Sequence, residues 1–102
     1  MKRIFWKGYC HQERIKAIYD IENIINRYGA IIDFKKFSDM ALTLLIEVDG
    51  DKTEALYIEL KQYLNMDDYN LFPTQQEISI FFNITFWKGK GDLVIETPAV
   101  PG

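Results

Sequence analysis

Residues 77–87, EISIFFNITFW, form the longest alternating stretch of the chain, and the rest of the fold can be built outward from them. The even-numbered positions are all apolar: Ile78, Ile80, Phe82, Ile84 and Phe86. The odd-numbered positions are mainly polar, with Phe81 and Trp87 as two aromatic exceptions. Because successive side chains of a β-strand point to opposite faces, this period of two predicts a strand with one buried face.

Three earlier stretches also have strand character. Residues 3–10 alternate, with Ile4 and Trp6 in the phase that we expect to face the core. Residues 30–37 and 41–48 are the second and third strands, and Ser38-Asp39 supplies the turn between them.

Two stretches between the strands have helical spacing, residues 12–28 and 53–64. Apolar residues recur on one face of each: Ile18, Ile21, Ile25 and Tyr28 in the first, and Leu56, Leu60, Tyr63 and Leu64 in the second. Gly29 follows the first helix and is the expected C-cap, because glycine adopts positive φ without steric cost. Asp51 and Glu54 precede the second helix at capping-box spacing.

The predicted element order is therefore β-α-β-β-α-β in an α+β protein. This order favours a ferredoxin-like sandwich, with a four-stranded antiparallel sheet and both helices on one face. We expect the first and last strands to be antiparallel neighbours. Residues 65–76 are a predicted loop and residues 93–97 a short fifth strand. Residues 1–97 then form one domain, followed by a flexible tail over 98–102.

The tetrapeptide Phe-Trp-Lys-Gly occurs twice, at residues 5–8 and 86–89. The strand phases place Trp6 inward and Trp87 outward, so the two copies present different faces. We interpret them as ends of two strands rather than as a duplicated binding motif.

Two helices cover one face of such a sheet, so the opposite face should be polar in a monomer. Instead it combines polar residues with large apolar ones, a composition typical of interfaces. The predicted oligomer interface is Phe5, Ile31, Phe37, Leu45, Phe81 and Trp87. We expect a homo-oligomer, with a dimer favoured. The alternative is that these are scattered surface hydrophobes covered by residues 65–76 or by the tail.

Composition excludes several classes of protein. A net charge of −3 in 102 residues argues against a nucleic-acid partner, which needs a basic surface. No apolar stretch approaches the roughly 20 residues that span a bilayer, and the N-terminus lacks a signal-peptide pattern. The single Cys10 excludes an internal disulfide and fits a reducing compartment. We therefore expect a cytoplasmic protein without a membrane partner.

The loop between the first strand and first helix, residues 7–14, is the best candidate pocket. Backbone N–H groups at a helix N-terminus suit an anion or carboxylate. The predicted ligand-binding residues are Lys7, Gly8, Tyr9, His11 and Arg14.

Cys10 and His11 are adjacent, and adjacent residues in an extended segment point apart, so the expected role of Cys10 is structural. One cysteine and one histidine supply too few ligands for a metal site. The sequence therefore predicts no catalytic residue, no metal and no cofactor.

Residues 3–37, including YGAIIDF at 28–34, resemble ACT-type regulatory domains, as does the order of elements over about 85 residues. The resemblance implies a small module that pairs through its sheets or edges and binds amino acids or similar effectors near the first strand–helix loop. The family's usual acidic loop with Pro-Gly is replaced here by Gly8-Tyr9-Cys10-His11-Gln12, so only Gly8 carries over.

These features together favour a small-molecule-binding or regulatory interaction module that acts as a homo-oligomer. The expected ligand is a small anion or an amino acid. Two alternatives stay open: a small enzyme that uses Cys10, His11 or Tyr9, and a structural partner subunit without a ligand.

Overall fold

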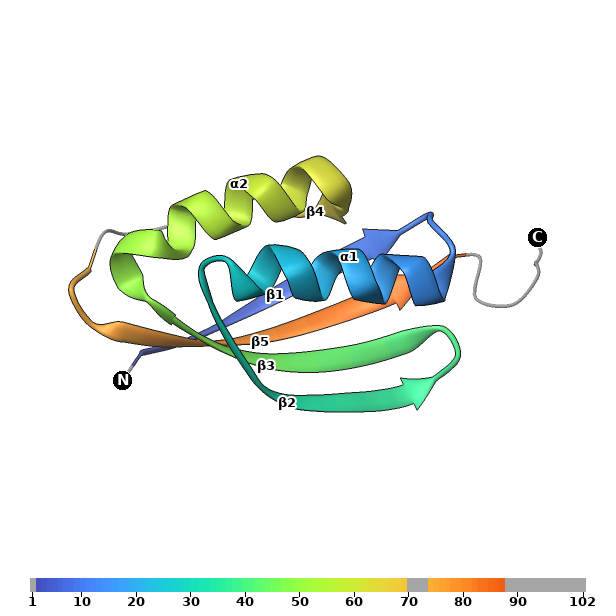
Figure 1. Cartoon of the computed structure of the whole chain (residues 1–102), viewed down its shortest axis with the longest axis horizontal. Helices are drawn as coiled ribbons and strands as arrows, with labels where there is room; N and C mark the ends of the chain where they lie inside the picture. The colour runs from blue at the N-terminus through green and yellow to red at the C-terminus, as the bar shows by residue number, and fades with distance from the viewer. Residues whose placement is uncertain (1, 70–73, 88–102) are drawn as a thin grey trace.

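The computed structural model describes residues 2–69 and 74–87 and has an α+β architecture. A five-stranded mixed sheet is covered by two α-helices (Figure 1). The elements are β1 (Lys2–Cys10), α1 (Arg14–Asn26), β2 (Gly29–Ser38), β3 (Ala41–Asp49), η1 (Gly50–Lys52), α2 (Thr53–Tyr63), β4 (Asn65–Met66) and β5 (Glu77–Phe86). The order of strands across the sheet is β2-β3-β5-β1-β4.

The last long strand occupies the centre of the sheet, which corrects the expected four-stranded antiparallel arrangement. β5 lies between β3 and β1, antiparallel to β3 and parallel to β1. The prediction that the first and last strands are antiparallel neighbours was wrong in direction, although the two are neighbours. The physical reason is burial: β5 is the most completely buried strand, and a central position pairs both of its backbone edges.

A short strand that the sequence did not indicate closes one edge of the sheet. Within the predicted loop 65–76, β4 pairs antiparallel with β1 at Gly8 and Tyr9. The fifth strand expected at 93–97 and the tail at 98–102 lie outside the described residues.

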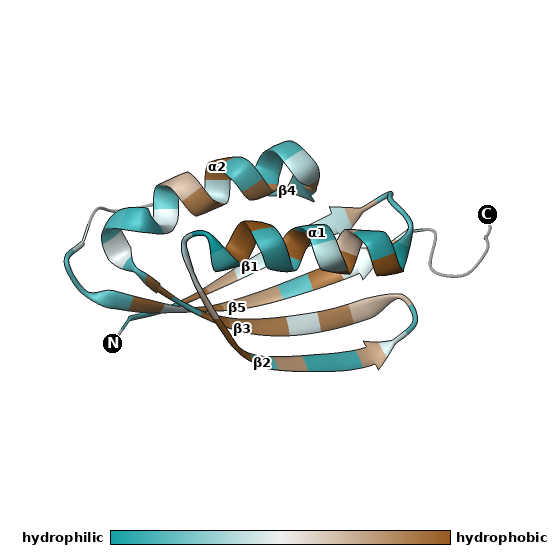
Figure 2. Ribbon diagram, viewed as in Figure 1, coloured by the Kyte–Doolittle hydropathy of each residue, from teal (hydrophilic) through white to brown (hydrophobic). Residues whose placement is uncertain are grey.

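One apolar core fills the space between the sheet and both helices. Inward residues of β1 and β3 alternate with exposed or half-buried ones, as the sequence predicted, and β5 follows the same alternation except at Ser79, which is also buried. Figure 2 shows hydrophobic residues on both helices and on the strands beneath them. The largest fully buried side chains include Ile21 and Ile25 of α1, Leu56 and Leu60 of α2, and Phe82 and Phe86 of β5. Because both helices contribute to one cluster, they cover the same face.

β2 departs from the predicted alternation. The sequence placed Ile31 on the uncovered face, and strict alternation along this strand would put Ile32 and Phe34 beneath the helices. The structure packs Ile31 against the core and leaves Ile32 51 % exposed. Register shifts between Ile31 and Asp33 and between Lys36 and Ser38 are the cause, because an extra residue in one strand reverses the phase that follows it.

The two helix termini also differ from expectation. Asp51 lies in η1, and α2 starts without a side-chain cap, so the predicted capping box is not formed. Gly29 is the first residue of β2 rather than a C-cap, and its φ is outside the left-handed region. Across residues 2–69 and 74–87 no helix is long and apolar enough to span a membrane.

Candidate functional site

The face of the sheet opposite the helices, called here the open face, carries side chains in rows across the strands. One row is apolar: Phe5 of β1 lies beside Phe81 of β5, which lies beside Leu45 of β3. The rings of Phe5 and Phe81 stack at 5.2 Å between centroids with 16° between their planes. These two rings form a flat apolar platform on the central strands.

The next row is polar. Lys7 of β1, Asn83 of β5 and Thr43 of β3 are paired positions, and Asn83 Nδ2 donates to Thr43 Oγ1 at 3.1 Å. Within residues 2–69 and 74–87, no carboxylate oxygen lies within ion-pair distance of the Lys7 ammonium. The row therefore offers an unpaired cation beside an ordered amide.

A hollow of about 470 Å³ opens where these two rows meet the end of the β4 segment. We call this cavity the open-face hollow. It is lined by Phe5, Trp6, Lys7, Thr43, Asp67, Tyr69, Phe81 and Asn83. Ligand pockets have volumes of roughly 300–1,000 Å³, are mainly apolar and carry a few polar groups. The open-face hollow has this size and composition.

The wall that follows β4 is held by two hydrogen bonds. The Tyr69 hydroxyl accepts from the Lys7 backbone N–H at 2.7 Å, and the Tyr57 hydroxyl donates to the Asp67 carbonyl at 2.6 Å. The Tyr69 ring also packs against Trp6 and Tyr57. Burial raises the pKa of Tyr69, so its hydroxyl stays protonated at neutral pH and keeps a proton to donate.

The residues of the predicted ligand loop point to different places. Lys7 and Tyr9 lie on the open face, whereas Gly8 is buried on the helix side against Leu64 and Phe82. His11 is exposed and stacks on Trp87, with 5.8 Å between ring centroids. Of the five predicted ligand residues, only Lys7 lines the open-face hollow.

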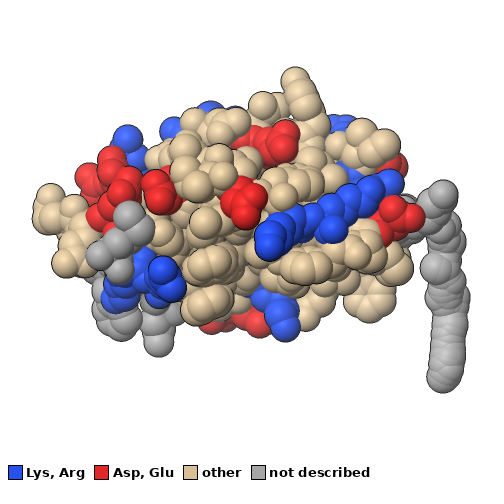
Figure 3. Space-filling model, turned by 90° about the horizontal axis from the view of Figure 1, so that it is seen from below, with Lys and Arg blue, Asp and Glu red and all other residues tan. Residues whose placement is uncertain are grey.

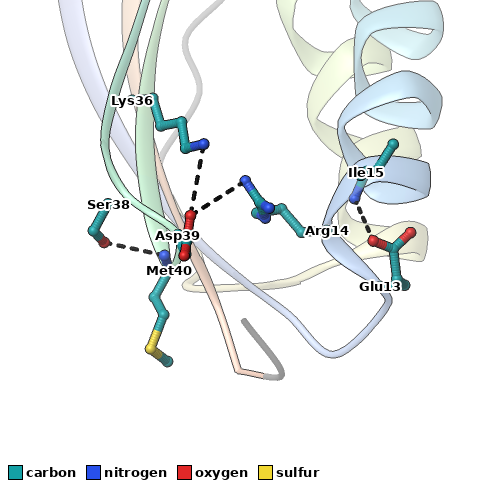
Figure 4. Close-up of polar contacts among 7 residues, drawn as sticks. All are labelled: Glu13, Arg14, Ile15, Lys36, Ser38, Asp39 and Met40. Atoms are coloured by element: carbon teal, nitrogen blue, oxygen red, sulfur yellow. Dashed lines mark hydrogen bonds and ion pairs between the residues drawn. The ribbon is translucent and has the colours of Figure 1, made fainter. Parts of the chain in front are cut away.

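The N-terminus of α1 is already occupied by a carboxylate of the chain itself. Glu13 is the N-cap, and its side chain accepts from the backbone N–H groups of Ile15 and Lys16 at 2.9 Å. Arg14 turns toward Asp39 in the turn between β2 and β3, and Lys36 approaches the same carboxylate (Figure 4). These contacts tie the start of α1 to the end of the β2–β3 hairpin.

Cys10 is enclosed in the core, with 0 % of its surface exposed. Burial raises the pKa of its thiol, and a hydrogen bond from the Gln12 backbone offsets this only in part. A protonated, enclosed thiol is a poor nucleophile.

We expect alkylation of Cys10 in the native protein to be about a thousandfold or more slower than in denaturant. The reagent can react only after the core opens, and opening of a stable domain is rare. Reaction with an excess of maleimide, followed by mass spectrometry, measures both rates. A native rate close to the denatured one would instead support the enzyme alternative.

The predicted interface residues are spread over the molecule. Phe5, Leu45, Phe81 and Trp87 lie on or beside the open face, and Phe37 is exposed on β2. The open-face hollow includes only two of them, Phe5 and Phe81. Asp67 and Tyr69 were missed because the polar loop that contains them has no periodicity, and nothing in its residues indicated contact with β1.

Comparison of the chain with protein-family models, curated proteins and solved structures finds no match. The resemblance to ACT-type domains therefore stays a prediction. Among the described residues, no group of three His, Cys, Asp or Glu side chains is placed to hold a metal ion.

Proposed function

We propose that this chain is a binding module whose open-face hollow holds a small amphipathic molecule with a flat apolar body and a carboxylate. The observation that carries this proposal is the combination of a stacked aromatic platform with a lysine at its border that pairs with no carboxylate of the described residues. A free aromatic amino acid has the matching chemistry.

The apolar body of such a ligand would lie on the Phe5–Phe81 platform. Stacking of aromatic rings adds about 0.5–1.5 kcal/mol to the free energy gained by burying their surface. Phe5 is 69 % exposed, so much of its ring surface is available to a ligand.

The polar end of the ligand would be bound by side chains at the border of the platform. The Lys7 ammonium attracts a carboxylate, and Tyr69 and Asn83 offer hydrogen-bond donors. Asp67 places a negative charge in the same lining, which suits the ammonium group of an amino acid. A zwitterion would therefore satisfy both signs of charge in the hollow.

The two alternative functions have less support. The enzyme alternative relied on Cys10, His11 or Tyr9, and none of these lines the hollow. A structural subunit without a ligand would leave the platform and Lys7 without a role.

A ligand-induced shift in melting temperature tests the proposal. We expect phenylalanine or tryptophan to stabilise the protein more than phenylacetate, which lacks the ammonium group, and more than phenethylamine, which lacks the carboxylate. A ligand at 100 times its Kd adds about 2.7 kcal/mol, and each kcal/mol raises the melting temperature of a domain this size by about 4–8 °C. Thermal unfolding with each compound gives the ranking.

Lys7→Met should weaken the best compound about tenfold or more, because it removes a charge-assisted hydrogen bond. Lys52→Met is the matched control, since Lys52 is an exposed residue of η1 outside the hollow. If none of the four compounds shifts the melting temperature at millimolar concentration, the proposed ligand class is wrong. A shift that Lys7→Met leaves unchanged would place the ligand elsewhere on the protein.

A further inference from the structure

The two edges of the sheet differ in how they are protected. At the β1 edge, β4 pairs with Gly8 and Tyr9, and the Tyr69 hydroxyl accepts the next N–H, that of Lys7. At the other edge, no strand of the described chain pairs with the outer side of β2. Figure 3 views the molecule from the side on which β2 lies in Figure 1, and both signs of charge are present there. An uncovered edge presents backbone groups that can pair with another strand.

The part of β2 suited to pairing is the regular segment 33–36 between its two register shifts. Asp33 and Lys35 pair with Leu45 and Thr43 of β3, so they face the open side. Phe34 and Lys36 pair with the buried Leu44 and Leu42, so they lie on the helix side.

A hydrogen bond shows which backbone groups face outward. The Phe34 N–H donates to Oδ1 of the neighbouring Asp33 at 2.9 Å. This bond directs the Phe34 N–H away from β3, toward the uncovered edge, and a strand that pairs there would replace Asp33 Oδ1 as its acceptor with a backbone carbonyl. Since outward-facing residues alternate along an antiparallel strand, Lys36 also faces outward, whereas the backbone groups of Asp33 and Lys35 face β3.

This alternation restricts how β2 can pair with a second copy of itself. A residue whose backbone N–H and C=O point to the outer edge must lie opposite a residue of the same kind in the second copy. Such residues are two positions apart along the strand. The twofold axis that relates the two copies must therefore pass through a residue and not between two residues. An axis at Asp33 would set Asp33 against its own copy, and an axis at Lys35 would oppose two lysines. An axis at Phe34 instead sets Asp33 of each copy opposite Lys35 of the other. Opposite charges stabilise a directly facing pair and like charges destabilise it.

We propose that two copies of this chain pair antiparallel through their β2 edges, about a twofold axis at Phe34. The two Phe34 rings lie opposite each other on the helix side, and two Asp33–Lys35 pairs lie on the open side. Ile32 is 51 % exposed and Phe34 39 %, so the contact also covers apolar surface at the edge. The two sheets become one continuous sheet with all four α-helices on the same side.

The proposal is independent of the ligand site. The open-face hollow lies over β1, β5 and β3, whereas the contact uses β2 at the edge of the sheet. The register shifts on either side of residues 33–36 keep the paired segment short, so we expect a weak dimer that dissociates on dilution.

Charge reversal tests the register. Sedimentation equilibrium should show wild-type protein approaching twice its 12.0 kDa mass as its concentration rises to millimolar. Asp33→Lys and Lys35→Asp should each be monomeric, because each opposes like charges at both pairs. The double variant D33K/K35D should dimerise again. An equimolar mixture of the two single variants should also form a dimer, because positions 33 and 35 then carry opposite charges across the contact.

Glu54→Lys is the matched control, because it reverses an exposed charge on α2 away from β2 and should leave the dimer intact. Circular dichroism verifies that each variant is folded. A wild-type protein that stays monomeric at millimolar concentration would overturn the proposal. A dimer that both single charge reversals leave intact would also overturn it. In that case, loss of the dimer on Phe81→Lys would assign the contact to the open face, and loss of the dimer on Ile95→Lys would assign it to residues 93–97.

Discussion

Replacing Phe82 with alanine is expected to lower the free energy of unfolding by about 3–5 kcal/mol, the usual cost of deleting a buried aromatic ring. Phe82 is 0 % exposed and lies in the middle of the central strand. Its ring packs edge-on against Trp6 at 6.1 Å between centroids and lies close to the backbone of Gly8. Domains of this kind are stable by about 5–15 kcal/mol, so this one change removes a large part of the total.

Phe81→Ala is the matched control, because it makes the same deletion one residue away on the open face. Phe81 is half-buried and its main partner is the exposed ring of Phe5, so we expect a loss of about 1–2 kcal/mol. Guanidinium denaturation of wild type and both variants measures the two losses. Equal losses would contradict the assignment of the two rings to opposite faces of the sheet.

Gly29→Ala is expected to destabilise the protein by about 3 kcal/mol, because the added methyl group has no space. A Cβ built at Gly29 lies 2.3 Å from the Glu47 carbonyl oxygen and 3.0 Å from Val48 Cβ. The closest atom belongs to the backbone of β3, so relief requires β2 to move away from its partner. Forced overpacking of this kind costs about 1–3 kcal/mol and occasionally more.

Gly8→Ala is the comparison for this prediction. The atoms nearest a Cβ at Gly8 are side-chain carbons of Phe82 and Leu64, at 3.2 and 3.3 Å. Side chains can move by a few tenths of an ångström, so we expect a loss of about 1 kcal/mol. Urea denaturation compares the two alanine variants. A Gly29→Ala protein as stable as wild type would show that the two strands separate at little cost.

The periodicity of the sequence identified the long elements closely. The predicted strand 77–87 is observed as Glu77–Phe86, and the predicted helix 12–28 as Arg14–Asn26. Alternation also placed Trp6 and Phe82 inward and Phe81 and Trp87 outward. These predictions hold because local spacing alone decides which side chains of an element share a face.

Part of the candidate site was also predictable. Phe5 and Phe81 were singled out because they are outward residues of strands, and Lys7 because it belongs to the predicted ligand loop. Their meeting in one hollow depends on the parallel register that pairs Phe5 with Phe81 and Lys7 with Asn83. The antiparallel arrangement expected from the element order would have paired different residues of the two strands. The direction of a neighbouring strand cannot be predicted from the local pattern of residues.

The amino-acid pattern by itself determined the kinds and order of the long elements and the inward face of β1, β3 and β5. The long-range pairing set the rest: β5 at the centre, β4 and Tyr69 on the edge of β1, and β2 uncovered with its phase shifted. The physical reason is that the spacing of hydrophobic residues depends only on residues that are close together along the chain. Strand order and register instead depend on which distant segments can bury the most apolar surface while pairing their backbones.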